Sequence, residues 1–137
     1  MTSTNAMPTA SPVVYLDTSA AVKLLSDERE SEALRHYLDG GPTVVSSDLL
    51  ETELRRIGVR HHLDQVLITA VLDGMSLTPL TRDQSREAGL FPQVGLRSLD
   101  ALHLACALGI EASAILTYDI RLADAARAHG LEVIAPQ

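Results

Sequence analysis

Two short apolar runs, each followed by an aspartate and then by a helical pattern, set narrow limits on the fold of this chain. Val13–Leu16 comes directly before Asp17, and Ala114–Tyr118 comes directly before Asp119. Runs this short and this apolar are typical of strands buried on both faces of a parallel sheet. Because three further apolar runs alternate with helical patterns, the sequence predicts an α/β fold in which helices cover both faces of a largely parallel sheet.

Clear breaks separate the predicted elements. Gly40–Pro42 ends one helix and Gly130 ends the last one. Thr18 and Ser19 are expected to cap the first helix. The helix at 98–108 is apolar on nearly every side, which indicates a buried element. The predicted strands are residues 13–17, 43–46, 75–80, 114–118 and 131–134, and the predicted helices are residues 20–25, 30–38, 48–57, 63–72, 81–90, 98–108 and 120–129.

The chain is expected to form one domain, residues 13–137, after a loose polar tail, residues 1–12. Its 137 residues suffice for one core and leave no room for a second catalytic domain. The tail lacks the basic start and apolar stretch of a secretory signal, and no apolar run reaches the roughly twenty residues that cross a membrane. The single cysteine, Cys106, has no partner for a disulfide or a zinc site. These features predict a protein of the reducing cytoplasm.

The charge balance excludes one way of binding nucleic acid. A formal net charge of −7 opposes adhesion to phosphate through a generally basic surface. An aromatic content of 3% leaves no platform on which bases could stack. Contacts with phosphate would have to come from single arginines, and the candidates are Arg82, Arg86, Arg97 and Arg121.

Helical spacing separates two glutamates that lie close together in the sequence. Glu51 stands four residues before Arg55, so an exposed ion pair explains it. Glu53 falls three residues after Leu50 and four before Ile57, on the stripe that faces the core. An acid on that stripe needs a partner, so Glu53 is a candidate for the site.

The acids at strand ends and in the buried helix complete the candidate set. Asp17 and Asp119 follow apolar strands, where ligands bind in α/β sheets, although a helix cap also explains each one. Asp100 lies in the first turn of the helix at 98–108, where the helix dipole favours a negative charge. His103, one turn later, could be a ligand but is interpreted as a neutral core imidazole bonded to a nearby acid or carbonyl. Asp124 is interpreted as the surface partner of Arg127.

Four carboxylates in one crevice imply a cation. Without one, each would raise the pKa of the others, so removing one acid is expected to relieve repulsion. Oxygen ligands without a Cys/His set select Mg²⁺ or Mn²⁺, which take phosphate oxygens as further ligands. The reaction expected from this arrangement is hydrolysis of a phosphodiester bond.

Four segments carry a resemblance to a known family. They are Leu16–Ala20 (LDTSA), Ser46–Ser47 with Glu53, Leu96–Ala105 (LRSLDALHLA) and Leu116–Leu122 (LTYDIRL). They resemble the successive motifs of PIN-domain ribonucleases, in particular the VapC toxins of bacterial type II toxin–antitoxin pairs. The resemblance extends from Val13 to about Ala135, and its third and fourth motifs are specific. The chain departs from the pattern in the longer polar segment before Val13.

The resemblance implies a five-stranded parallel sheet, endoribonuclease activity dependent on Mg²⁺ or Mn²⁺, homodimerisation, and neutralisation by a small cognate antitoxin. It places Asp17, Glu53, Asp100 and Asp119 on the family's four acidic positions, as catalytic and metal-binding residues. Asp17 and Asp100 fall on the two that commonly hold the metal directly. The supporting hydroxyls that orient the acids fall on Thr18 and Thr117.

The residues suggest three other interpretations. A phospho-acceptor receiver domain needs an acidic pair after its first strand and a lysine after its last, but Leu16 precedes Asp17 and the only lysine is Lys23. A phosphatase with an Asp-x-Asp nucleophile has an acid where this chain has Ser19. A PIN-like scaffold that binds RNA or protein without cutting is disfavoured by the complete set of acids and stays open.

Overall fold

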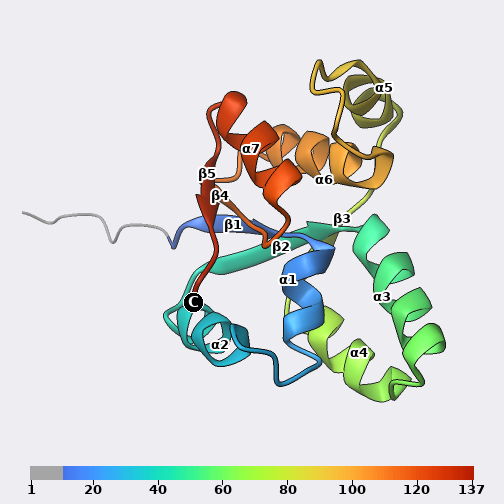
Figure 1. Ribbon diagram of the computed structural model, residues 1–137, viewed down its shortest axis with the longest axis vertical. Coiled ribbons are helices and arrows are strands. Elements are labelled where there is room, and N and C mark those ends of the chain that lie inside the picture. The colour runs from blue at the N-terminus through green and yellow to red at the C-terminus, as the bar shows by residue number, and fades with distance from the viewer. Residues whose placement is uncertain (1–10) are drawn as a thin grey trace, which may run out of the picture.

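The computed structural model describes residues 11–137, which form a five-stranded sheet between two layers of helices (Figure 1). The strand order is β3-β2-β1-β4-β5, and every neighbouring pair is parallel. Residues 1–10 of the expected tail lie outside the described residues. The strands are β1 (Val13–Leu16), β2 (Thr43–Ser47), β3 (Ser76–Thr78), β4 (Ala114–Leu116) and β5 (Glu132–Ile134).

The helices divide between the two faces of the sheet, which confirms the predicted fold class. The first four pack on one face and the last two on the other, while the fifth packs against the sixth rather than on the sheet (Figure 1). One layer is α1 (Thr18–Lys23), α2 (Ser31–Asp39), α3 (Asp48–His61) and α4 (Gln65–Asp73), and the other is α5 (Arg82–Leu90), α6 (Ser98–Gly109) and α7 (Ile120–Ala128). Among residues 11–137, no helix is long and apolar enough to cross a membrane.

Side chains of the central strand alternate between the two cores. Val14 and Leu16 pack with the helices of the first layer, whereas Tyr15 points into the second layer beside Leu104 of α6. All four are essentially inaccessible to solvent. Because successive side chains of a strand point to opposite faces of the sheet, Tyr15, whose ring ends in a hydroxyl group, lies against the buried face of α6.

The strand order reverses between β1 and β4, and this is where ligands bind in open parallel sheets. The chain adds β2 and β3 on one side of β1 and then returns to place β4 on the other side. Asp17 directly follows β1, and Asp119 follows β4 after Thr117 and Tyr118. The prediction that these two acids follow neighbouring strands is confirmed.

Two local predictions were wrong. The first helix begins at Thr18, and its cap is Asp17, whose Oδ1 accepts from the backbone N–H of Ala20 at 3.0 Å, rather than Thr18 or Ser19. Asp17 has the extended backbone that an N-cap requires, so the acid at the strand end also starts the helix. The third strand is three residues long rather than six, because β3 is an edge strand that pairs only with β2, through Ser76–Thr78.

Candidate active site

All four acids predicted from the sequence line one pocket at the carboxyl ends of β1 and β4. The pocket has a volume of about 320 Å³, and Asp17, Glu53, Asp100 and Asp119 all contribute to it. Each acid comes from a different element: the end of β1, α3, α6 and the start of α7. The structure thus brings together side chains that are as many as 102 residues apart, from 17 to 119.

Asp17 is the most buried of the four, with 1% of its surface exposed. Its Oδ1 accepts from Ser19 Oγ at 2.8 Å as well as from Ala20 N, and its Oδ2 accepts from Thr117 Oγ1 at 2.6 Å. Burial raises the pKa of Asp17, although these donors oppose the rise. The carboxylate is therefore held rigidly, in a place where negative charge is poorly solvated.

Glu53 has the partner that its place on the core stripe required. Its Oε1 accepts from Thr18 Oγ1 at 2.7 Å and lies 2.6 Å from His103 Nε2. Burial alone would raise its pKa, but the hydrogen bond and charge of His103 and the hydrogen bond of Thr18 lower it overall. Glu53 is therefore ionised near neutral pH, and the interpretation of His103 as a core imidazole bonded to an acid is confirmed.

Asp100 carries the least compensated charge. No hydrogen bond reaches its carboxylate from any of residues 11–137. Burial, followed by the negative charges of Asp119 and Asp17, raises the pKa of Asp100 to about 6. Asp119, by contrast, caps α7 by accepting from Leu122 N at 3.0 Å. The pocket therefore holds more negative charge than its own donors balance.

The residues fit a hydrated divalent ion better than a closed metal cage. Among the residues that the structure describes, no group of three or more acidic, histidine or cysteine side chains is placed so that it could hold a metal ion, so an ion here would have fewer protein ligands. Mg²⁺ is usually held by one or two carboxylates and keeps several waters until phosphate oxygens replace them. An oxygen-only set with excess charge at Asp100 meets that requirement, so the residues fit a hydrated divalent cation.

Arginines border the acids on one side. Arg97 lines the acid pocket and also a neighbouring hollow, which Arg121 and Asp119 line as well. Both arginines are exposed. Arg82 and Arg86 lie on α5 and line neither of these two hollows. Of the four arginines predicted to contact phosphate, two therefore stand beside the acids.

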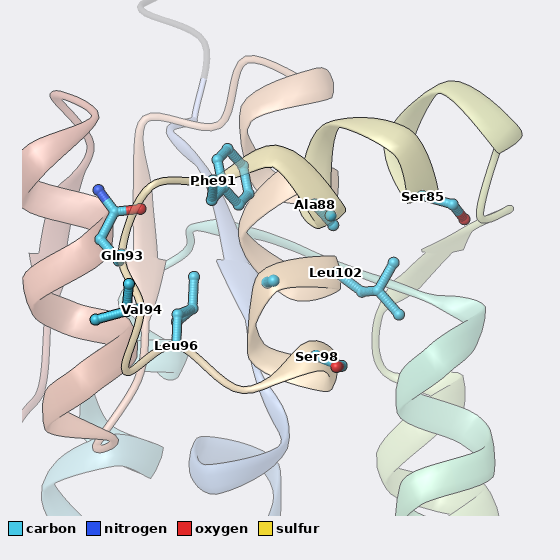
Figure 2. A pocket seen from close by; sticks show the side chains of 10 residues that line it. Ser85, Ala88, Phe91, Gln93, Val94, Leu96, Ser98 and Leu102 are labelled. Carbon is cyan, nitrogen blue, oxygen red and sulfur yellow. The ribbon is translucent and has the colours of Figure 1, made fainter.

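A larger hollow is lined by none of the acids, although it shares Ser98 with the acid pocket. It has a volume of about 530 Å³ and lies between α5, the loop that follows it and α6, where Phe91, Leu96 and Leu102 line it (Figure 2). Its polar lining comes from Ser85, Gln93 and Ser98. Because no titratable side chain lines it, size alone does not mark this hollow as a place for hydrolysis.

The supporting residues were predicted in part. Thr117 orients Asp17, and Thr18 orients Glu53. Ser19 was missed: its hydroxyl donates to Asp17 and accepts from Tyr118 N at 2.9 Å. The sequence places this hydroxyl two residues after Asp17, close enough to bond to it, but Ser19 was interpreted only as a helix cap.

The predictions that Glu51 and Asp124 form ion pairs on the surface are confirmed. Glu51 Oε2 accepts from Arg55 Nε at 3.1 Å, and Asp124 lies 3.5 Å from Arg127 Nη1. Cys106 is a buried free thiol.

Comparisons with known proteins agree with this geometry. The family model described as PIN domain matches residues 14–128. The ribonuclease VapC46 of Mycobacterium tuberculosis is 41% identical over 129 residues, which cover 90% of this chain and 97% of that protein. The ribonuclease VapC35 of the same species is 40% identical over 135 residues, with the same coverage of both chains.

Solved structures show the same fold at low sequence identity. The M. tuberculosis toxin VapC20, described as cleaving the sarcin–ricin loop, superposes with a TM-score of 0.72 at 15% identity, over 90% of this chain and 99% of that one. A chain of a toxin–antitoxin complex from Klebsiella pneumoniae superposes with a TM-score of 0.70 at 19% identity, over 90% and 98%.

Proposed function

The chain belongs to the PIN-domain family, and we propose that it is a divalent-metal-dependent endoribonuclease, the toxin of a toxin–antitoxin pair. Relatives that are about 40% identical over 90% of the chain bear the name ribonuclease VapC. Asp17, Glu53, Asp100 and Asp119 are the residues that we assign to catalysis and to the metal.

One observation carries the proposal: four carboxylates line a single pocket at the point where the strand order reverses, and their charge is not balanced. Structural caps would account for Asp17 and Asp119 but not for Asp100, which lacks a hydrogen bond among residues 11–137. A cation at this position would oppose the burial, and then the charges of Asp119 and Asp17, that raise the pKa of Asp100.

Each acid has a distinct task in the proposed mechanism. Asp17 and Asp100 would hold Mg²⁺ or Mn²⁺, with Glu53 and Asp119 beside them, and the bound ion would supply polarisation of the phosphate and activation of water. Asp17 is held in place by Thr117 and Ser19. Glu53 Oε1 is occupied by its two partners, so Oε2 is the oxygen that is free to orient water or accept its proton.

The arginines beside the pocket suit a phosphate backbone. In a protein with a net charge of −7, they supply local positive charge next to Asp119. Arginine binds phosphate through two parallel hydrogen bonds, independently of base sequence. We therefore place the RNA strand across the hollow of Arg97 and Arg121, with the phosphate to be cut over the acids.

Metal removal tests the activity. We expect Mg²⁺ or Mn²⁺ to support cleavage of a total RNA pool and EDTA to abolish it, with activity restored by excess metal. Product ends detected by gel electrophoresis provide the measurement, and the heat-inactivated protein is the blank. A folded protein that binds RNA but produces no new ends with either metal would instead be the non-catalytic scaffold.

Exposed apolar side chains on α3 and α4 form a surface that suits protein partners. We assign an antitoxin and a second copy of the chain to this surface. Val66 and Leu67 of α4 are 72% and 58% exposed, and Val59 of the adjoining α3 is 55% exposed. Side chains of this size are rarely left in contact with water in such a group. On α2, no large hydrophobic residue is strongly exposed.

We expect the chain without its antitoxin to be a homodimer whose interface includes Val66 and Leu67. Light scattering at high micromolar concentration should give twice the mass of one chain, and Val66→Asp with Leu67→Asp should reduce it to the monomer without unfolding it. A monomeric wild-type protein at that concentration would contradict self-association and leave the antitoxin as the occupant of this surface.

A further inference from the structure

Behind Glu53 lies a buried chain of hydrogen bonds to which neither the family motifs nor the proposed mechanism gives a task. His103 Nε2 lies 2.6 Å from Glu53 Oε1, and its Nδ1 lies 2.7 Å from the hydroxyl oxygen of Tyr15. The Tyr15 hydroxyl oxygen is also 2.9 Å from Ser47 Oγ. Tyr15 is fully buried, and His103 is 1% exposed.

The donor in the hydrogen bond between His103 and Glu53 can be identified. Glu53 Oε1 already accepts from Thr18 Oγ1, and a glutamate carboxylate at neutral pH is an acceptor only. The hydrogen between the two groups must therefore belong to His103 Nε2, which donates to Oε1. Thr18 Oγ1, 3.1 Å from Nε2, donates its own hydrogen to the same oxygen.

Tyr15 prevents the ring from turning. The two rings meet edge to face, with their centroids 5.6 Å apart and their planes at 67°. Rotating the imidazole by half a turn would place carbon atoms opposite both Tyr15 and Glu53, and both hydrogen bonds would be lost. Burial raises the pKa of Tyr15, so the phenol keeps its hydrogen at neutral pH.

The chain of bonds also connects the two helical layers. Glu53 lies on α3 in one layer, and His103 lies on α6 in the other, three residues after Asp100. The bond between them therefore fixes the distance of Glu53 from the helix that carries Asp100. Thr18, on α1, is in the same layer as Glu53 and cannot supply this connection.

We propose that Tyr15 and His103 are positioning residues for the active site: they hold Glu53 Oε1 so that its other oxygen faces the pocket at a set distance from Asp100. Groups behind a metal ligand commonly act this way. The inference rests on the proposed function, because it deepens the role of the same pocket.

The test compares His103→Leu with His103→Gln, whose amide nitrogen can still donate to Glu53. We expect His103→Leu to bind Mn²⁺ about 10- to 100-fold more weakly by calorimetry without RNA, and to lower kcat for RNA with little change in KM. His103→Gln should recover most of both losses. Tyr15→Phe leaves the His103 Nε2 donor in place but removes the hydrogen bond that keeps the imidazole from turning, so it should have a smaller effect.

A matched control separates positioning from packing. Leu34→Val changes a fully buried residue of α2, which packs in the core on the other face of the sheet and belongs to a helix that carries none of the site's residues, so it should lower Tm but leave Mn²⁺ affinity and kcat unchanged. The proposal is overturned if His103→Leu binds Mn²⁺ like the wild type, or if His103→Gln is as weak as His103→Leu. If the wild type binds Mn²⁺ without cutting RNA, the ribonuclease proposal fails, while the Mn²⁺ affinities of the variants still decide the positioning role.

Discussion

Asp100→Asn is expected to abolish RNA cleavage and, in the absence of metal, to raise the Tm of the protein. Loss of a residue behind a metal ligand costs about 10- to 100-fold in activity, so loss of a ligand should cost more than about 100-fold. The gain in stability follows from the carboxylate's surroundings, since burial and the charges of Asp119 and Asp17 raise its pKa to about 6. Asparagine keeps the shape of the side chain and removes the charge.

The stability gain has a defined pH dependence. The usual pKa of 3.8 rises to about 6 on folding, so the folded protein binds this proton more tightly than the unfolded chain. The penalty from Asp100 is absent below about pH 4, grows between the two pKa values and is complete above pH 6. A shift of this size corresponds to about 3 kcal/mol, which solvent screening at this half-buried site reduces to about 1 kcal/mol.

Metal should reverse the order of stability. Mg²⁺ or Mn²⁺ binds only the folded protein, so it raises the Tm of the wild type more than that of Asp100→Asn. Glu51→Gln is the control, because Glu51 pairs with Arg55 on the surface and should change neither quantity. An Asp100→Asn variant that still cuts RNA, or that melts below the metal-free wild type at pH 7, would contradict the assignment.

The sequence was sufficient to predict which residues gather but not how they are held. Apolar runs before Asp17 and Asp119 indicate parallel strands, and carboxyl ends of neighbouring parallel strands share one edge. Glu53 was identified because helical spacing placed a charge on a core stripe. These predictions rest on local periodicity, which a single sequence contains.

The rest depends on contacts between distant segments. Tyr15 has an ordinary place in an apolar strand, and only the packing of α6 on the sheet brings it to within 2.7 Å of His103, 88 residues away. Where a strand ends also depends on the strand beside it. The strand β3 is short because it pairs with β2 over only three residues. The cap of α1 was misassigned because three consecutive residues, Asp17, Thr18 and Ser19, can all cap a helix, and the backbone at the end of β1 decides among them.

Asp17→Asn should also abolish cleavage, but its effect on stability should be opposite to that of Asp100→Asn. From the sequence, removing either acid was expected to relieve repulsion. The structure changes that expectation for Asp17, whose two oxygens accept from Ser19, Ala20 and Thr117. An asparagine has one acceptor oxygen and an NH₂ group that would face a hydroxyl donor.

The hydroxyls around Asp17 cannot easily turn to accommodate that NH₂ group. Thr117 Oγ1 already accepts from Asp119 N at 3.0 Å, and Ser19 Oγ accepts from Tyr118 N at 2.9 Å, so their hydrogens are directed at Asp17. Loss of a cap costs about 1 kcal/mol, and a buried donor without a partner costs about 1–3 kcal/mol. Burial raises the pKa of Asp17, so removing its charge offsets part of this cost.

We therefore expect Asp17→Asn to lower the free energy of unfolding by about 2 kcal/mol at pH 7 without metal, measured by urea denaturation beside Asp100→Asn and the wild type. Opposite signs for the two variants would show that Asp17 organises the end of β1 and the start of α1, while Asp100 mainly adds charge to the pocket. A gain in stability for Asp17→Asn would mean that repulsion among the four acids outweighs its hydrogen bonds, and that all four depend on the cation in the same way.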